Sequence, residues 1–260
     1  MRMFAYASGI GGANPHCGEG PLVLPIQWDA VFAPASSIPA LEVKRMTEAL
    51  AVKTEECIQK KEFFIVVGGD HTSAMGTWRG VAKGLFGPLG LIWIDAHMDS
   101  HTLETSLSQR LHGMPLASLL GYGDKASIDP ENLCLIGVRS YEEGEAALLK
   151  KLKVRIYFME EVKERGLAVV FKEALQKITK NTVAYGISVD IDSIDPSEAP
   201  GVDVPESDGL LPKELIPLLK EVSTDPRLIG AEIVEFDPTQ DQEQKTQKLV
   251  MQLIESLKNV

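Results

Sequence analysis

The chain has 260 residues and a formal net charge of −11, from 26 basic and 37 acidic side chains. This acidic balance argues against a nucleic-acid partner, because phosphate binding needs a basic face. The longest apolar runs are strand-sized, so we expect no membrane partner. The only cysteines, Cys17, Cys57 and Cys134, form no disulfide framework or C-x-x-C pair, and they fit a reducing, cytoplasmic compartment.

Short apolar runs alternate with amphipathic ones along the chain. The first run becomes polar too quickly for a signal peptide, so it predicts a strand instead. In chain order the pattern predicts a strand at Met3–Ser8, a helix at Ala40–Lys60, a strand at Phe63–Val67, a helix at Ser73–Lys83, a strand at Leu91–Asp95, a helix at Pro115–Leu120, a strand at Leu133–Val138, a helix at Glu142–Leu152, a strand at Val154–Phe158, a helix at Glu161–Ile178, a strand at Val183–Asp190, a helix at Pro212–Val222, a strand at Leu228–Phe236 and a helix at Glu243–Leu257.

The predicted strands are rich in Ile, Val, Phe and Tyr, and several are almost continuously apolar, as strands buried on both faces are. Their alternation with helices predicts an α/β fold with a mostly parallel sheet and helices on both faces. We find no linker or internal repeat, so residues 1–260 are expected to form a single domain. In such a sheet, ligands bind beyond the carboxyl ends of the strands.

The first polar motif of interest follows the run Phe63–Val67 and reads GGDHTS. The two glycines allow a tight turn, and His71 falls at the start of the next predicted helix. Taken alone, His71 reads more readily as a helix-capping or buried structural residue than as a metal ligand.

The second motif, DAHMD, follows the apolar run Leu91–Ile94. It places Asp95, His97 and Asp99 at alternate positions, which on an extended chain share one face. Three such groups at a buried strand end are costly unless a cation offsets them. A solvated loop with incidental charge is the alternative, and the apolar run directly before it argues against that.

The third motif, SVDIDSIDP, ends the run Val183–Asp190. Asp190 and Asp192 again alternate at a strand end. Aspartates also terminate strands and cap turns, and for Asp195, before Pro196, that is the preferred interpretation. For Asp190 and Asp192 we favour metal binding, because they supply carboxylates that the first two motifs lack.

Together the motifs offer two imidazoles and four carboxylates as metal ligands. Such a mixture suits Mn²⁺, and also Zn²⁺, Co²⁺ or Ni²⁺. One ion would not need six ligands of this kind, so we expect two ions with some carboxylates bridging. Four carboxylates balance two divalent ions, and a bridging hydroxide would make the cluster negative, which favours a cationic substrate. The predicted ligands are His71, Asp95, His97, Asp99, Asp190 and Asp192.

These three motifs, in this order, resemble the ureohydrolase family of arginases, agmatinases and related guanidino or formimino hydrolases, and arginases most. The resemblance extends from Gly68 to Pro238. It implies the three-layer arginase fold, two Mn²⁺ per chain, a homotrimer or homohexamer, and metal-ligand roles for the six residues. It also implies that Asp99 passes a proton to the departing amine.

Two further segments match this family. The stretch LHGMP resembles its HGxP motif, whose histidine shuttles protons, so the resemblance assigns that role to His112; without it, His112 could be a loop residue. The stretch IVEFDP resembles a strand ending in a glutamate that binds the substrate guanidinium, which here is Glu235. A carboxylate at a strand end is suited to a planar cation, although Glu235 could also lie exposed at an edge.

The substrate's far end is expected to meet three residues. The thirteen-residue spacing from Asp99 to His112 equals that of arginases, which places Ser108 where a serine binds the α-carboxylate. Glu142 falls where an acidic residue meets the α-amino group, and His101 replaces the usual asparagine. All three could instead lie on solvated loops.

The chain departs from the arginase pattern at Gly201–Pro205, which reads GVDVP instead of GTGTP, so Val204 lacks the expected hydroxyl and Asp203 adds a charge.

The resemblance favours L-arginine as the substrate, cleaved to L-ornithine and urea. Agmatine has no α-carboxylate for Ser108. The alternatives are an agmatinase or another guanidino- or formimino-acid hydrolase, and a catalytically silent metal-binding scaffold.

Overall fold

The computed structural model describes residues 1–258, in which eight strands form one sheet. The strands are β1 (Arg2–Tyr6), β2 (Ala30–Phe32), β3 (Phe64–Gly68), β4 (Leu89–Ile94), β5 (Leu133–Val138), β6 (Arg155–Phe158), β7 (Ala184–Asp190) and β8 (Leu228–Val234). Their order in the sheet is β2-β1-β3-β8-β7-β4-β5-β6, and every neighbouring pair is parallel. The sheet predicted as mostly parallel is therefore wholly parallel.

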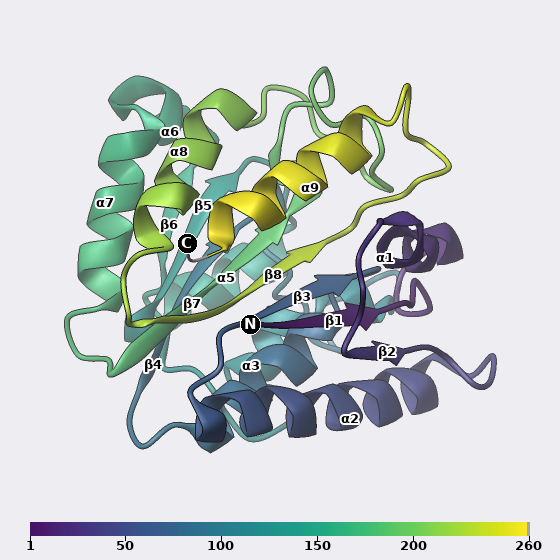
Figure 1. The fold of residues 1–260 in the computed structure, drawn as a ribbon. Helices are drawn as coiled ribbons and strands as arrows, with labels where there is room; N and C mark the ends of the chain where they lie inside the picture. Colours follow the sequence, from purple (N-terminus) through teal and green to yellow (C-terminus); the bar gives the residue numbers. More distant parts are fainter. Residues whose placement is uncertain (259–260) are drawn as a thin grey trace.

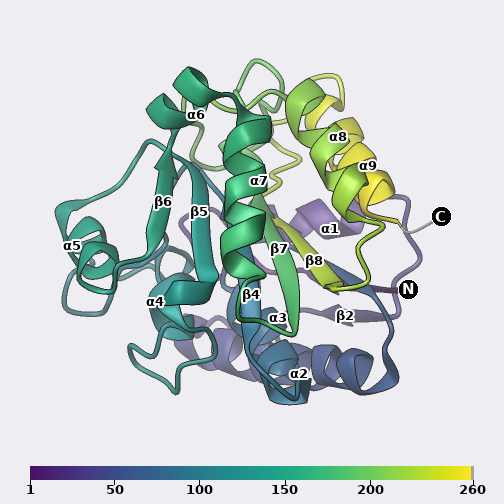
Figure 2. The same cartoon turned by 90° about the vertical axis from the view of Figure 1, so that its left-hand side faces the viewer.

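Helices cover both faces of this sheet and make three layers (Figure 1). They are α1 (Gly20–Val23), α2 (Pro39–Lys60), α3 (Ser73–Gly84), α4 (Pro115–Leu119), α5 (Glu143–Lys151), α6 (Met159–Arg165), α7 (Leu167–Ile178), α8 (Pro212–Val222) and α9 (Lys245–Leu257). Figures 1 and 2 show α2 and α3 packed together on one face and α7, α8 and α9 on the other. The three-layer α/β prediction is confirmed.

The core lies on both sides of the central strands. Every residue of β3, β4, β5 and β7 is buried, which explains why these strands are almost continuously apolar in the sequence. On one side they pack against α2 and α3 through residues such as Trp78, and on the other against α7, α8 and α9. None of the helices within residues 1–258 combines the length and the apolar character needed to cross a bilayer.

Several predicted boundaries are wrong for local backbone reasons. The single helix expected at Glu161–Ile178 is two helices, α6 and α7, because Gly166 between them has a φ of 84°, outside the helical region. The strand expected to reach Phe236 ends at Val234, because Glu235 has a φ of 65°. The edge strand β2 was not predicted, since its three residues are too short for a periodic signal.

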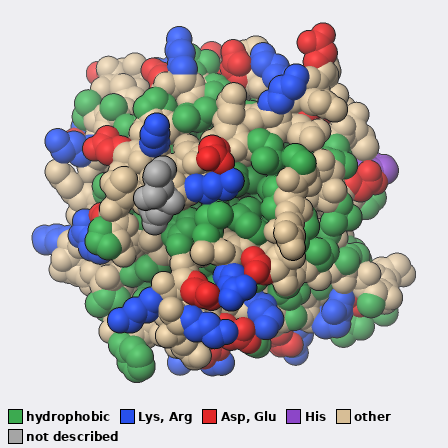
Figure 3. Space-filling view, viewed as in Figure 1, with side chains coloured by type: hydrophobic (Ala, Val, Ile, Leu, Met, Phe, Trp, Pro, Cys, Tyr) green, Lys and Arg blue, Asp and Glu red, His purple; other side chains and the backbone are tan. Residues whose placement is uncertain are grey.

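The outer surface on one side combines apolar and charged areas. Figure 3 shows hydrophobic side chains gathered in the centre of that face, with basic and acidic side chains along its lower edge, over α2. Exposed large apolar side chains in the chain include Met1, Leu22, Val23 and Val31.

Candidate active site

The strand order brings four chain segments together at one edge of the sheet. Strands β3, β8, β7 and β4 are consecutive neighbours and parallel, so their carboxyl ends lie side by side. His71 follows β3, Asp95 follows β4, Asp190 ends β7 and Glu235 follows β8. Residues separated by more than 160 positions in the sequence therefore meet at one place, the edge where ligands of parallel α/β sheets bind.

His71 is fully buried just before α3, and its ring is held on two sides. The ring stacks on Trp93 with a centroid distance of 4.0 Å and an interplanar angle of 10°. Its Nε2 atom lies 3.0 Å from the hydroxyl of Ser188. The imidazole therefore has one defined orientation, with Nδ1 directed at the aspartates.

Three carboxylate oxygens surround Nδ1 of His71. They lie at 3.4 Å from Asp95, 3.0 Å from Asp99 and 3.1 Å from Asp190. Yet this buried nitrogen has no hydrogen-bond partner among the described residues. An imidazole nitrogen that faces three oxygens without hydrogen-bond geometry fits a cation held between them.

A second group of possible metal ligands adjoins the first and shares Asp95 with it. The first consists of His71, Asp95 and Asp99, and the second of Asp95, His97 and Asp192. In the second, Nδ1 of His97 lies 2.9 Å from Asp192 and 3.6 Å from Asp95. All six predicted ligands thus come together, with Asp95 at the centre of the cluster and Asp190 beside His71.

Turns, and not extended backbone, bring these ligands together. Strand β4 ends at Ile94, and Asp99 has a φ of 47°. Asp95, His97 and Asp99 do lie together, but the expected reason, that they share one face of an extended strand, is wrong. Likewise, Asp192 lies in a 3₁₀ turn, where its backbone N–H donates to the carboxylate of Asp190 at 2.9 Å. The Asp95 carboxylate is fixed by Trp93, whose indole N–H donates to it at 2.8 Å.

Within residues 1–258, no lysine or arginine forms an ion pair with the clustered aspartates, which pair only with histidines. Burial, reinforced by the charge of Asp95, raises the pKa of Asp99 to about 7. Burial and neighbouring Asp192 raise the pKa of Asp190. Burial works against a charged His97, but the charge of Asp192 and its hydrogen bond outweigh this and raise the pKa of His97. The cluster thus holds protons that a divalent ion would displace on binding.

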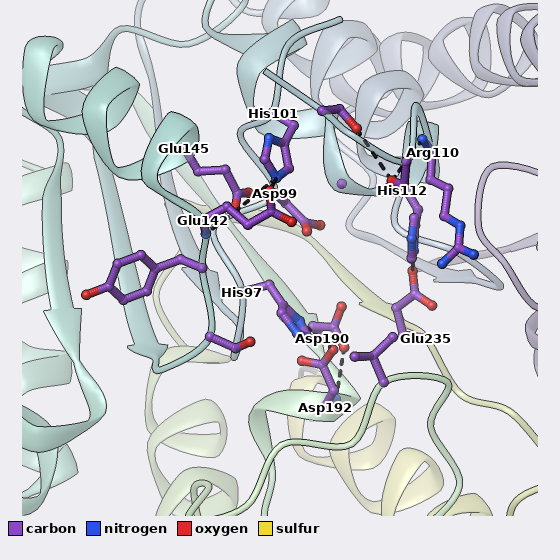
Figure 4. Close-up of a pocket in the computed structure, with 16 residues that line it drawn as sticks. His97, Asp99, His101, Arg110, His112, Glu142, Glu145, Asp190, Asp192 and Glu235 are labelled. Carbon is purple, nitrogen blue, oxygen red and sulfur yellow. Dashed lines mark hydrogen bonds and ion pairs between the residues drawn. The ribbon is translucent and has the colours of Figure 1, made fainter. Parts of the chain in front are cut away.

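Glu235 and His112 lie together at the edge of this cluster (Figure 4). Oε1 of Glu235 accepts the backbone N–H of His71 at 2.8 Å and lies 3.5 Å from Nδ1 of His112. Burial disfavours the charged imidazole, but the hydrogen bond to Glu235 and its charge raise the pKa of His112 to about 9. Glu235 is therefore buried at the site, and the edge-exposed alternative is wrong.

One cavity of about 290 Å³ connects the cluster to the other predicted residues. Its lining includes His97, Asp99, Asp190, Asp192, His112 and Glu235, together with His101, Ser108 and Glu142. Nε2 of His101 lies 3.4 Å from Glu145 and 3.6 Å from Glu142, and Figure 4 shows these three side chains grouped on one wall. The expected head-group residues thus border the same cavity as the His/Asp cluster.

Val204 and Asp203, the departures from the arginase pattern, lie near the cluster. Val204 lines the cavity and is exposed. Burial and the charge of Glu235 raise the pKa of Asp203. The departure thus changes the wall of the cavity without altering any of the six clustered residues.

The sequence does not predict three residues that lie at or beside the site, Glu145, Arg110 and Glu232. Glu145 and Arg110 line the cavity but belong to no strand end, so no local signal indicates them. Glu232, in β8, is fully buried and accepts hydrogen bonds from three hydroxyl groups behind His71. Burial raises its pKa, whereas His71 and the three hydroxyls favour the charged form. A glutamate within the apolar run LIGAEIV was a signal that could have found it.

Fold and site define a parallel α/β protein with two adjoining groups of candidate His/Asp metal ligands at the carboxyl edge of its sheet. The Arginase family model matches residues 21–258. The chain is 40% identical over 220 residues to the arginase of Bacillus subtilis strain 168, covering 81% of this chain and 73% of that one. It is 39% identical over 224 residues to the arginase of Bacillus caldovelox, covering 83% and 75%.

Solved structures agree with the sequence comparison. The native arginase of Bacillus caldovelox superposes with a TM-score of 0.91 at 31% identity, covering 98% of this chain and 97% of that one. The chain belongs to the arginase family. It is accordingly an enzyme that hydrolyses linear amidines, as the sequence predicts.

Proposed function

We propose that this enzyme hydrolyses L-arginine to L-ornithine and urea. The proposal rests on one cavity that is lined by two groups of residues. The first group is the His/Asp cluster with Glu235 and His112, and the second consists of His101, Ser108 and Glu142. A substrate with a guanidinium group at one end and an amino-acid group at the other would meet suitable partners at both. The names of the relatives point to the same reaction.

We propose that the cluster holds two divalent ions, with Mn²⁺ as the first choice and Co²⁺, Ni²⁺ or Zn²⁺ as alternatives. His71, Asp95, Asp99 and Asp190 would hold one ion, and Asp95, His97 and Asp192 the other. When bound, such a pair lowers the pKa of a shared water and supplies the nucleophile. The buried, unpartnered Nδ1 atom of His71 supports this arrangement.

The protein side chains would then position the substrate and move protons. The carboxylate of Glu235 would bind the planar guanidinium through charge-assisted hydrogen bonds. As water adds to the guanidinium carbon and the bond to the substituted nitrogen breaks, Asp99 would pass a proton to that nitrogen. His112, whose side chain is 19% exposed and lies beside Glu235, would exchange protons with solvent.

At the far end, Ser108 would donate to the α-carboxylate and Glu142 would accept from the α-amino group. His101 lies between Glu142 and Glu145, where a protonated ring would also attract the α-carboxylate. Agmatine lacks that carboxylate and would not form these contacts with Ser108 and His101. This asymmetry favours arginine over agmatine.

We further propose a cytoplasmic homotrimer or homohexamer formed by a single domain spanning residues 1–260. The three buried, unpaired cysteines support a reducing compartment. The apolar area at the centre of the face in Figure 3 supports contact between copies. Light scattering coupled to size exclusion would measure the mass of the assembly.

The deciding experiment is a urea assay on protein reconstituted with Mn²⁺. The substrates would be arginine, agmatine, guanidinobutyrate and formiminoglutamate, with formamide measured for the last. We expect the highest kcat/KM for arginine. A higher value for another substrate would replace the proposed substrate, and no turnover of any would favour a catalytically silent scaffold.

A further inference from the structure

Glu232 is a fully buried carboxylate that lies behind the metal cluster and lines no part of the cavity. Its Oε1 atom accepts the hydroxyls of Ser73 and Thr77, each at 2.7 Å, and its Oε2 atom accepts the hydroxyl of Ser188 at 3.1 Å. Ser73 and Thr77 belong to α3 and Ser188 to β7. The carboxylate thus joins β8 to both elements that flank His71.

The single hydroxyl proton of Ser188 determines which ring nitrogen of His71 can donate to it. The Ser188 hydroxyl has one proton, and it is donated to Glu232. Its oxygen can then only accept from Nε2 of His71, 3.0 Å away. In the neutral ring that binds a metal ion, Nε2 therefore carries the proton, which leaves the lone pair on Nδ1, the atom that faces Asp95, Asp99 and Asp190.

Packing alone does not account for this carboxylate. Burial of a carboxylate without a cation is costly, and the described residues place no lysine or arginine in contact with Glu232. A side chain of similar shape without a charge would pack in the same space at lower cost. The hydrogen bonds that the Glu232 carboxylate accepts come from both sides of His71. Ser73 lies in the helix that follows His71, and Ser188 contacts the ring of His71.

We propose that Glu232 is a positioning residue for the metal centre, which acts through Ser188 to hold Nδ1 of His71 toward the ion. The inference rests on the proposed function, because it presumes that His71 is a metal ligand. Outer hydrogen bonds to a ligating histidine fix its orientation and raise its basicity, and their loss typically weakens metal binding by about 10–100-fold.

The test is Mn²⁺ affinity of the metal-free protein, measured by equilibrium dialysis with metal analysis, for the parent, Glu232→Gln, Ser188→Ala and the double variant. We expect Glu232→Gln and Ser188→Ala each to weaken Mn²⁺ binding at one of the two sites, the one that contains His71, by about 10-fold or more. The double variant should weaken it little further, because both changes break one relay. Thermal unfolding of each metal-free variant is measured in parallel.

Ser256→Ala is the matched control. It removes another buried hydroxyl, which donates to a backbone carbonyl within α9, away from the cluster. We expect Ser256→Ala to leave Mn²⁺ affinity within about two-fold. If Glu232→Gln does not fold, Ser188→Ala decides alone.

The outcomes separate a positioning role from a structural one. Lower melting temperatures with unchanged Mn²⁺ affinity in the folded variants would overturn the inference and leave the proposed function standing. Additive losses in the double variant would overturn the relay through Ser188. A parent protein that binds no Mn²⁺ would remove the metal centre and this inference with it.

Discussion

His112 and Glu235 form a close pair at the edge of the His/Asp cluster, with Nδ1 of His112 3.5 Å from Oε1 of Glu235. The same oxygen accepts the backbone N–H of His71. Glu235 is thus connected both to the proposed proton shuttle and to the loop that carries a proposed metal ligand. A guanidinium bound by Glu235 would lie between these two groups.

His112 is expected to assist turnover without holding metal. Because it contacts Glu235 and belongs to neither group of possible ligands, His112→Ala should lower kcat by about 10²-fold, the lower end of the range for one acid–base group, with metal content unchanged. Steady-state kinetics and metal analysis of the same sample measure both quantities. Loss of metal from this variant would make His112 a ligand and contradict the assignment.

The His112–Glu235 pair should also affect stability with a defined pH dependence in the metal-free protein. The pKa of His112 is raised from an ordinary value of 6.5 to about 9, so the charged ring stabilises the folded state. This contribution is fully present below pH 6.5 and is lost as the pH rises through 9, and it amounts to at most about 3 kcal/mol.

Thermal unfolding of the parent and His112→Gln, both without metal, would measure this effect. The parent should melt higher at pH 6, and the difference should vanish by pH 10. A difference that stays constant over this range would show that His112 does not change its charge there.

Two divalent ions per chain are expected after reconstitution, because the cluster contains two adjoining groups of ligands. Asp95→Ala should be the most damaging single change, since Asp95 belongs to both groups, and Asp190→Ala should also abolish activity. Both variants should remain largely folded, because neither aspartate belongs to the hydrophobic core, and Asp190→Ala also relieves repulsion with Asp192 and Asp95. Elemental analysis and circular dichroism provide the measurements, and a parent with one ion or none while active would refute the paired centre.

Specificity for arginine should depend on the cavity wall opposite the cluster. Ser108→Ala and His101→Ala should each lower kcat/KM for arginine by about 10-fold, the loss of one hydrogen bond to a charged group, and should change agmatine turnover little. Metal content serves as the control. If neither variant affects arginine, the head group binds elsewhere, while the hydrolase assignment is unchanged.

Much of the site was accessible from the sequence because its ligands follow recognisable apolar runs. His71 comes after Phe63–Val67, and Asp95, His97 and Asp99 come within five residues of the end of another run. Residues so close along the chain cannot lie far apart, and the spacing of apolar residues reports burial directly. The parallel α/β class was predictable for the same reason.

The tertiary structure alone decided which segments are neighbours. Strand β8, from the last quarter of the chain, lies between β3 and β7, which brings Glu235 and Glu232 beside His71. Glu145 reaches the cavity wall from α5, and Trp93 stacks on His71 from a different strand. Hydrophobic periodicity specifies whether a strand is buried but not which strands flank it, because that choice depends on how helices and strands distant in sequence pack against one another.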